Sequence, residues 1–520
     1  MAELITNKKI FKKNILRFGI CFFVIFIISG LLEFGISRIL YMFLNHELFY
    51  DYARFWFFVG LMTAILLCVF VYKKFIQRVE VIFLFLALII GSSMILCAPF
   101  GHICFDLESH FKFVLSLTPN DGTVTGAEEF FCEDGTKTIY RASYNSNNEF
   151  REEVNNLDNT VVEKTYNAHF QLSHLPGTII YSLGKLMGLP FSIRIDLIRF
   201  LYLFLYSIIC YFAIKKLKSN KLIFLVIALF PSNLFLASNI TYDWWVTSFI
   251  MLGIAYFISE MQQPSKPIAL AESCIMCGSL MLGCLPKQIY FPLLLIPFIL
   301  KKDIFKDNRS ERFKHYSVAV IFILVLLISL FFRLPSDVSS GDMRGGEGVS
   351  SPDQIMFILS HPLTYIKILF RYLLDYLSIG NFLYTTSNFS EITNYPNLHF
   401  AKDFGAFIIL LIVCVIFDHD KVDKYTCTWK NRILVSTIVL VTIILICTAL
   451  YVSFTPVGAL TIEGCQARYL TPLLIPIMPL FGNRKIANYF NKKNFIFTIT
   501  LLISIFTFWD IASTMLVWML

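Results

Sequence analysis

Apolar runs of about 17–25 residues recur along this 520-residue chain and are separated by short polar segments. Runs of this length match the hydrocarbon thickness of a bilayer, and backbone groups in lipid must be hydrogen-bonded within their own segment. We therefore predict an all-α polytopic membrane protein with about thirteen transmembrane helices. Their expected centres lie near residues 24, 63, 89, 205, 229, 252, 276, 293, 324, 411, 442, 475 and 506. The first run, from Ile15 to about Tyr41, is too long for a cleaved signal sequence and is expected to be retained.

Lysine and arginine gather in alternate loops between the apolar runs, and the intervening loops contain few of them. By the positive-inside rule this pattern predicts a cytoplasmic N-terminus, and an odd number of spans places the C-terminus outside. We expect a multi-pass protein of the plasma (inner) membrane. The basic clusters lie within Lys8–Arg17, Lys73–Arg78, Lys215–Lys221, Lys301–Lys314, Lys421–Arg432 and Arg484–Lys493.

Two long segments interrupt the regular alternation on the predicted outer side. The first contains Leu175–Ser192, which is short and amphipathic and is expected to lie flat on the outer leaflet. The second contains Ile355–Leu383, interpreted as an interfacial or re-entrant helix, with a full span as the alternative. The predicted organisation is spans 1–3 (1–97), a first large outer loop (98–194), spans 4–9 (195–333), a second outer loop (334–402) and spans 10–13 (403–520).

Composition supports the membrane class and excludes some partners. Hydrophobic residues make up 57% of the chain and charged residues only 15%, too few for a soluble protein of this length. The net charge of +8 arises from short loops between spans, so we expect no nucleic-acid partner. Most of the thirteen cysteines lie inside spans; Cys104 and Cys132 share the first outer segment, where pairing is possible but not fixed by spacing.

A polar group follows the third apolar run and contains Asp106, Glu108 and His110. In a helix, Asp106 and His110 would share one face at i,i+4 spacing. Asp106 is then a candidate general base for a hydroxyl group, and His110 could orient it, bind phosphate or help to hold a metal. The alternative is a solvated loop outside a span.

Two further polar groups lie on the same predicted side. Asn239 and Asp243 stand at the ends of the fifth and sixth spans, where Asp243 either caps a helix or binds substrate. Lys287 lies in a tight turn on a side otherwise poor in basic residues. It could pair with a phosphate or with an acid of the first group, or extend to the lipid headgroups.

The fourth group precedes the twelfth span and contains Gln466, Arg468 and Tyr469. An arginine at the edge of a membrane helix is costly unless it is paired. Its planar guanidinium suits a phosphate or pyrophosphate, and contact with lipid headgroups is the alternative.

Histidines of the first outer segment leave a metal site open. His169 and His174 could join Asp106 or Glu108 around a divalent cation, but spacing across loops does not fix such a site. We therefore assign no metal ligands and name no cofactor, with a divalent metal ion as the alternative.

The order of these motifs resembles a bacterial polytopic family, domain of unknown function 2142. The motif with Gly464, Gln466, Arg468, Tyr469 and Pro472 carries the resemblance most specifically, and the likeness extends over about Ala98–Pro476. That family is similar to the GT-C superfamily of membrane glycosyltransferases, which use sugars linked to polyprenyl phosphate or pyrophosphate. The resemblance implies a catalytic acid in the first large outer loop. The family pattern Asp-Glu-x-x-His is matched here by Asp106 and His110, with the second acid displaced by one position to Glu108.

The four polar groups map to one side, which indicates a single outward-facing site. The expected function is transfer of a sugar from a lipid-linked donor to a glycan or lipid acceptor of the cell envelope at the outer leaflet. The expected catalytic residues are Asp106, His110 and Glu108. Donor phosphate would contact Arg468, Lys287, Gln466 and Tyr469, and substrate could contact Asp243, Asn239 and His174. The alternatives are a transporter or flippase of lipid-linked glycans, which would need polar residues deep within several spans, and a non-catalytic scaffold of an envelope-synthesis complex.

Overall fold

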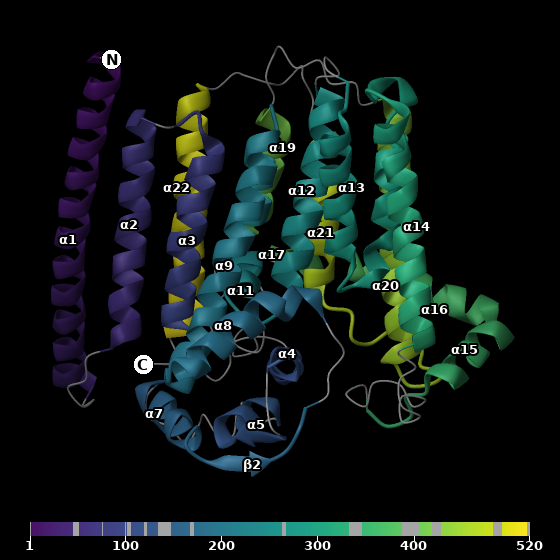
Figure 1. Cartoon of the computed structure of the whole chain (residues 1–520), viewed down its shortest axis with the longest axis horizontal. Coiled ribbons are helices and arrows are strands. Elements are labelled where there is room, and N and C mark those ends of the chain that lie inside the picture. The colour runs from purple at the N-terminus through teal and green to yellow at the C-terminus, as the bar shows by residue number, and fades with distance from the viewer. Residues whose placement is uncertain are drawn as a thin grey trace.

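The computed structural model shows a bundle of helices that stand side by side, with smaller elements gathered at one end (Figure 1). The structure describes residues 2–44, 51–74, 76–98, 100, 106–118, 122–133, 147–166, 171–262, 267–331, 346–386, 405–418, 428–481 and 491–516. His102, Cys104 and His169 lie outside the described residues, so the predictions that involve them stay predictions.

Seven helices in the described part of the chain are long and apolar enough to cross a membrane. This confirms a helical, multi-pass membrane protein. The helices that contain these stretches are α1 (Ala2–Leu44), α2 (Tyr52–Lys74), α3 (Val79–Cys97), α9 (Phe191–Lys216), α12 (Asp243–Gln262), α20 (Trp429–Ser453) and α22 (Lys492–Ile511), which continues into a π-helical turn at Ala512–Leu516.

One of the other predicted centres falls on the continuous helix α14 (Asn308–Phe331), which has 24 residues. The rest fall on or next to shorter or interrupted helices, which are α10 (Lys221–Ala228) with α11 (Pro231–Ala237), α13 (Leu270–Cys284), the 3₁₀ helix η2 (Gln288–Ile299), α19 (Ala406–Phe417), and α21 (Thr471–Ile477) with the 3₁₀ turn η8 (Met478–Leu480). Proline explains several of these interruptions, because it lacks a backbone N–H and clashes with the preceding turn. Pro231 separates α10 from α11, and Pro292 and Pro297 lie inside η2.

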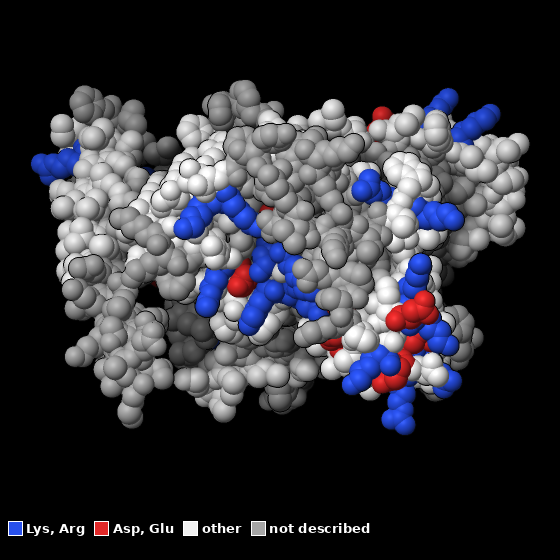
Figure 2. Space-filling view, turned by 90° about the horizontal axis from the view of Figure 1, so that it is seen from above, with Lys and Arg blue, Asp and Glu red and all other residues white. Residues whose placement is uncertain are grey.

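The two ends of the bundle differ in structure. Lysines and arginines gather on the upper end of Figure 1, which Figure 2 shows from above; we name it the basic end. The lower end carries the small elements and is named the α8 end. These elements are α4 (Leu107–Ser116), α5 (Gly126–Cys132), α7 (Asn147–Leu157), the 3₁₀ turn η1 (Leu172–His174) and α8 (Leu175–Leu186), with strands β1 (Thr123–Thr125) and β2 (Val161–Glu163).

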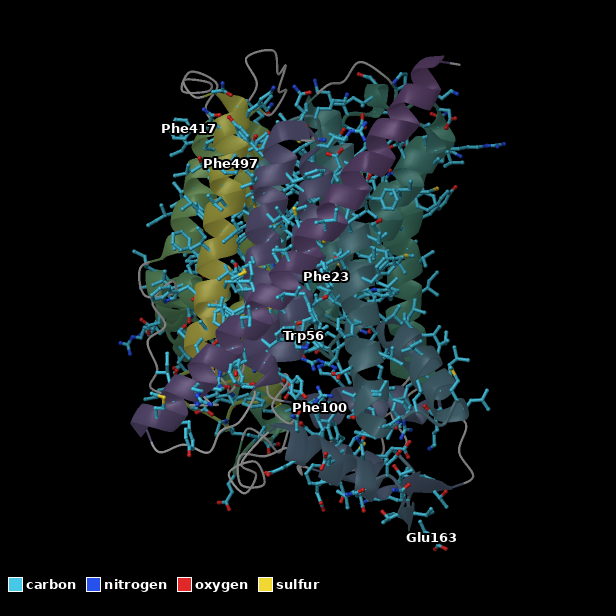
Figure 3. All side chains as sticks on the ribbon, turned by 90° about the vertical axis from the view of Figure 1, so that its left-hand side faces the viewer. Phe23, Trp56, Phe100, Glu163, Phe417 and Phe497 are labelled. Atoms are coloured by element: carbon cyan, nitrogen blue, oxygen red, sulfur yellow. The ribbon has the colours of Figure 1, made fainter. Side chains whose placement is uncertain are left out.

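The elements of the α8 end are tied together by polar contacts. Strands β1 and β2 pair antiparallel, a small exception to the predicted all-α class. Thr125 caps α5 in a reciprocal capping box with Glu128, whose carboxylate also accepts hydrogen bonds from Tyr181 and Lys185 of α8. Figure 3 shows Glu163 of β2 at the extreme of this end, beyond Phe100. Much of the predicted first outer loop is therefore ordered helix.

The predicted interfacial helix at Ile355–Leu383 is divided into separate helices. These are α15 (Ser351–Ser360), α16 (Pro362–Tyr376) and α17 (Ile379–Thr386). Pro362 begins a new helix because it cannot continue the preceding one. The apolar side chains of Leu359, Leu363 and Phe370 are exposed, as expected for helices that face lipid.

A buried ion pair fixes α1 against α2. The Glu33 carboxylate lies 3.0 Å from the Arg54 guanidinium, and it also accepts hydrogen bonds from the Ser37 hydroxyl and the Asp51 backbone N–H. Arg54 further pairs with Asp51 at 3.6 Å. Glu33 is fully buried, so these contacts replace the water that its charge would otherwise need.

We expect the substitution Arg54→Met to destabilise the protein by about 3–5 kcal/mol, because it leaves two buried carboxylates without their cation. Thermal unfolding in detergent measures the change. The double substitution Glu33→Gln with Arg54→Met is the matched control and should recover part of the loss. Equal melting temperatures for wild type and Arg54→Met would contradict this role of the pair.

Candidate functional site

Asp243 is the centre of an ion-pair cluster at the α8 end of the bundle. Its Oδ1 accepts a 2.6 Å hydrogen bond from Lys287 Nζ, and its Oδ2 lies 3.3 Å from Arg468 Nη1. Asp243 is the first residue of α12, Lys287 lies in the turn between α13 and η2, and Arg468 belongs to the 3₁₀ turn η7 (Ala467–Leu470). All three side chains are nearly buried. The fold therefore brings together three of the polar groups recognised in the sequence, those of Asp243, Lys287 and Arg468.

Asp106 joins this cluster and is its most open member. Its Oδ2 lies 3.4 Å from Arg468 Nη2, and its side chain is 35% exposed whereas that of Arg468 is 4% exposed. Asp106 precedes α4 rather than lying inside it, and its φ of 57° is in the left-handed region that few non-glycine residues adopt. Such strain persists only where the surrounding structure imposes it, and it is common at functional sites.

The backbone before Arg468 is shaped by a glycine. Gly464 has a φ of +78°, and a Cβ atom there would lie 2.7 Å from the ring of Phe454. The Tyr376 hydroxyl donates to the Gln466 carbonyl, and the Tyr290 hydroxyl donates to the Tyr469 carbonyl, at 2.9 Å each. These contacts hold the loop that presents Arg468.

Aromatic rings surround the cation Lys287. Its Nζ lies 4.2 Å from the centre of the Tyr469 ring and 4.9 Å from that of Tyr242. Ring faces attract cations at these distances, so the tyrosines stabilise a charge that water no longer reaches. The predicted phosphate ligand Tyr469 therefore contacts Lys287 through its ring.

Burial and ion pairing act in opposite directions on the two cations. Burial lowers the pKa of Lys287 to about 8, although Asp243 raises it in part. Burial also disfavours the charged form of Arg468, but the combined effect of Asp243, the neighbouring tyrosines and Asp106 outweighs burial and raises the pKa of Arg468 above the usual value. At neutral pH both side chains are charged, and both lie within 3.3 Å of the Asp243 carboxylate.

A second polar chain lies behind the cluster and contains both predicted histidines of the described chain. The His110 Nδ1 and His174 Nε2 atoms are 3.1 Å apart, and His174 Nδ1 lies 3.2 Å from the Tyr202 hydroxyl. The His110 ring also contacts the edge of the Tyr242 ring at 4.7 Å. His110 and His174 are buried, so they support the cluster from inside and do not form its open face.

Burial keeps both histidines neutral. It lowers the pKa of His110 well below the usual value, and the neighbouring His174 lowers it further. Burial also lowers the pKa of His174 to about 3, against a smaller opposing effect of Asp243.

Other predicted site residues take different places. Asn239 is fully buried, and its side chain donates to the Phe235 carbonyl and accepts from Arg199 Nε. Asn239 thus holds the turn before α12, and its expected substrate contact stays a prediction. Glu108 is half-buried in the first turn of α4, and Asp106 is the acid that meets Arg468. Gln466 contributes its backbone carbonyl, and its Oε1 is buried with no hydrogen-bond partner among the described residues.

Sequence reasoning missed several residues of the site. Tyr242 precedes Asp243 directly, and an aromatic beside a predicted site acid was the signal available. Arg194, Asp196 and Arg199 place three charges in the first turns of the apolar helix α9, which marks a buried polar network. Arg199 Nε donates to the Ser238 carbonyl and so fixes the turn that leads to Asp243.

Metal ligands do not gather in the described part of the chain. No group of three or more His, Cys, Asp and Glu side chains there could hold a metal ion. The metal site around His169 and His174, which the sequence left open, stays open, because His169 lies outside the described residues.

The neutral histidines predict a loss of stability in acid. Below the usual histidine pKa of about 6.5, the unfolded chain gains protons that the folded protein cannot accept until far lower pH. The free energy of unfolding should therefore fall as pH drops from 7 to 5, by up to about 1.4 kcal/mol per pH unit for each histidine. Thermal unfolding at a series of pH values should show a shallower slope for His174→Gln. The control His361→Gln, at an exposed position, should keep the wild-type slope, and an unchanged slope in His174→Gln would contradict the assignment.

Comparison with known proteins assigns the chain to a family. A family described as "Predicted membrane protein (DUF2142)" matches residues 141–477. The match contains Asp243, Lys287 and Arg468, whereas Asp106 and His110 precede it. No curated protein and no solved structure matches the chain. Because the match covers more than half of the sequence, the protein belongs to the family of predicted membrane proteins of domain of unknown function 2142.

Proposed function

We propose that the protein is a GT-C-type glycosyltransferase. It would move a sugar from a polyprenyl-phosphate or pyrophosphate donor to a glycan or lipid acceptor of the cell envelope. One observation supports this most directly: the half-exposed carboxylate of Asp106 lies 3.4 Å from the buried guanidinium of Arg468, at the end of a bundle of apolar helices. A base and a phosphate-binding cation thus stand together where a lipid headgroup would reach them.

The proposed topology has about thirteen spans with a cytoplasmic N-terminus in the inner membrane. The collection of lysines and arginines at the basic end supports this orientation (Figure 2). The ion-pair cluster would then face outward, within reach of donors and acceptors in the outer leaflet.

The chemistry assigns one role to each side of the cluster. Asp106 takes the proton from an acceptor hydroxyl while the hydroxyl oxygen attacks the anomeric carbon. The bond from that carbon to the donor phosphate breaks, and its electron pair stays on the phosphate oxygen. Arg468 and Lys287 stabilise the negative charge that develops there, the usual dominant effect in transfer reactions.

The charges of the cluster change in step with the reaction. Asp106, Asp243, Lys287 and Arg468 carry no net charge when all four are ionised. When Asp106 accepts the proton, the cluster gains one positive charge as the leaving phosphate gains one negative charge. The carboxylate that acts as base therefore releases Arg468 to the phosphate, and Asp243 keeps both cations in place.

Gln466 suits a sugar hydroxyl, whereas the two histidines position the cluster. The buried Gln466 Oε1 is an acceptor with no hydrogen-bond partner in the described chain, and a sugar hydroxyl could donate to it. His110 and His174 are positioning residues, because they pack behind Tyr242 and away from the open face.

We expect Asp106→Asn to reduce sugar transfer by about 10²–10⁴-fold, because asparagine keeps the shape and tolerates the left-handed backbone but cannot accept a proton. The assay uses the full chain in nanodiscs with radiolabelled polyprenyl-phosphate and pyrophosphate sugars. Running it with Mg²⁺ and with a chelator reports whether a divalent cation takes part. Arg468→Ala should weaken transfer as well, and a melting curve for each variant confirms folding.

The matched control is Glu153→Gln, which removes an exposed carboxylate of α7 at the same end and should retain full transfer. Transfer by Asp106→Asn at the wild-type rate would refute the base. Movement of the lipid-linked sugar across the membrane without transfer would favour a flippase instead.

A further inference from the structure

The basic end of α20 contains a hollow that is separate from the ion-pair cluster. The hollow has a volume of about 220 Å³. Six residues of α20 between Trp429 and Leu440 form one wall, and Phe481, which follows η8, forms the other. It lies along the first three turns of α20.

The α20 wall is a single stripe of the helix whose residues are half-buried or exposed. Its residues follow one another at intervals of three and four positions, which places them on one face. The buried residues of α20, such as Val435, Val439 and Ile446, lie on another face. From Trp429 to Leu440 the stripe is about 16 Å long, close to half the thickness of the hydrocarbon layer.

Arg432 makes this stripe unusual for a helix that faces lipid. Its Nε atom is buried and has no hydrogen-bond partner within the described ranges, and the lining of the hollow contains no carboxylate. A guanidinium that leaves water on a membrane helix is costly unless an anion meets it. Its fork of N–H groups matches a phosphate, and the hydroxyls of Ser436 and Thr437 lie one turn deeper as further donors.

The helix end adds to this preference for an anion. Arg432 lies in the first turns of α20, and the Thr428 side chain caps the helix through the Asn431 N–H. The remaining free N–H groups of the first turn give this end a partial positive charge. Below Arg432, the walls at Ile433, Leu440 and Phe481 are apolar and exposed.

We propose that this hollow is a binding site for an anionic phospholipid. The lipid phosphate would contact Arg432, and one acyl chain would lie along the α20 stripe against Phe481. An apolar stripe alone would accept any acyl chain, whereas the arginine selects a headgroup with net negative charge. The site lies at the opposite end of the bundle from the cluster and does not depend on the proposed transfer reaction.

Lipid retention tests the proposal on the full chain in a neutral detergent. Native mass spectrometry compares phosphatidylglycerol with phosphatidylcholine carrying the same acyl chains. We expect wild type to bind phosphatidylglycerol about tenfold more tightly, and Arg432→Gln to lose that preference while its phosphatidylcholine binding stays unchanged. Lys430→Gln, which removes a neighbouring exposed cation outside the hollow, is the matched control and should behave as wild type.

A second measurement locates the lipid. Phosphatidylglycerol with brominated acyl chains should quench the fluorescence of Trp429, and Trp429→Phe reports the share of quenching due to that residue. Thr437→Phe, which fills the hollow, should reduce the quenching, and inorganic phosphate should not compete with the lipid. Equal retention of both lipids by wild type, or wild-type preference and quenching in Arg432→Gln and Thr437→Phe, would overturn the proposal.

Discussion

The ion-pair cluster depends on the almost fully buried guanidinium of Arg468, which lies between the carboxylates of Asp106 and Asp243. A charge removed from water must meet opposite charge at close range, so the segments that carry these residues cannot separate cheaply. Lys287 adds a second cation on Asp243, and the rings of Tyr242 and Tyr469 cover it. This requirement positions four elements relative to one another: the N-terminal end of α12, the α13–η2 turn, η7 and the start of α4.

The breaks in the helices near η7 and α21 also help to place Arg468 in the ion-pair cluster. A helix that ran unbroken through η7 and α21 would carry Arg468 around a regular cylinder and away from Asp243. The positive φ of Gly464 and the prolines Pro472 and Pro476 allow a loop, a 3₁₀ turn and a short helix instead. Residues that look like poor membrane-helix formers are thus the ones that place the polar groups at the bundle end.

The sequence identified residues that form the ion-pair cluster, but it did not determine which of them pair with one another. Asp106, Asp243, Lys287 and Arg468 stood out because charges at the ends of apolar runs are rare and costly. The partner of Lys287 proved to be Asp243 and not an acid of the first group, because adjacency of helix ends depends on packing that periodicity does not report. The same limit explains Asn239, whose role is set by Arg199 in a distant helix, and the His110–His174 contact. The predicted span centres lie on or next to helices of the described chain, but seven of these helices are long and apolar enough to span a membrane, and internal prolines shorten several of the others.

Asp106 and Arg468 are 362 residues apart in the chain, and this separation has a consequence for biosynthesis. A ribosome completes Asp106, Asp243 and Lys287 long before it reaches Arg468. The membrane insertion machinery therefore handles an intermediate in which Asp243 and Lys287 neutralise each other and Asp106 still faces water. Arg468, the last charged residue of the cluster, joins it only after the segment that follows α20 has been synthesised. Maturation of the site is thus tied to the final stage of insertion, so that premature termination before η7 yields a membrane-embedded chain with three of its four charges and no finished site.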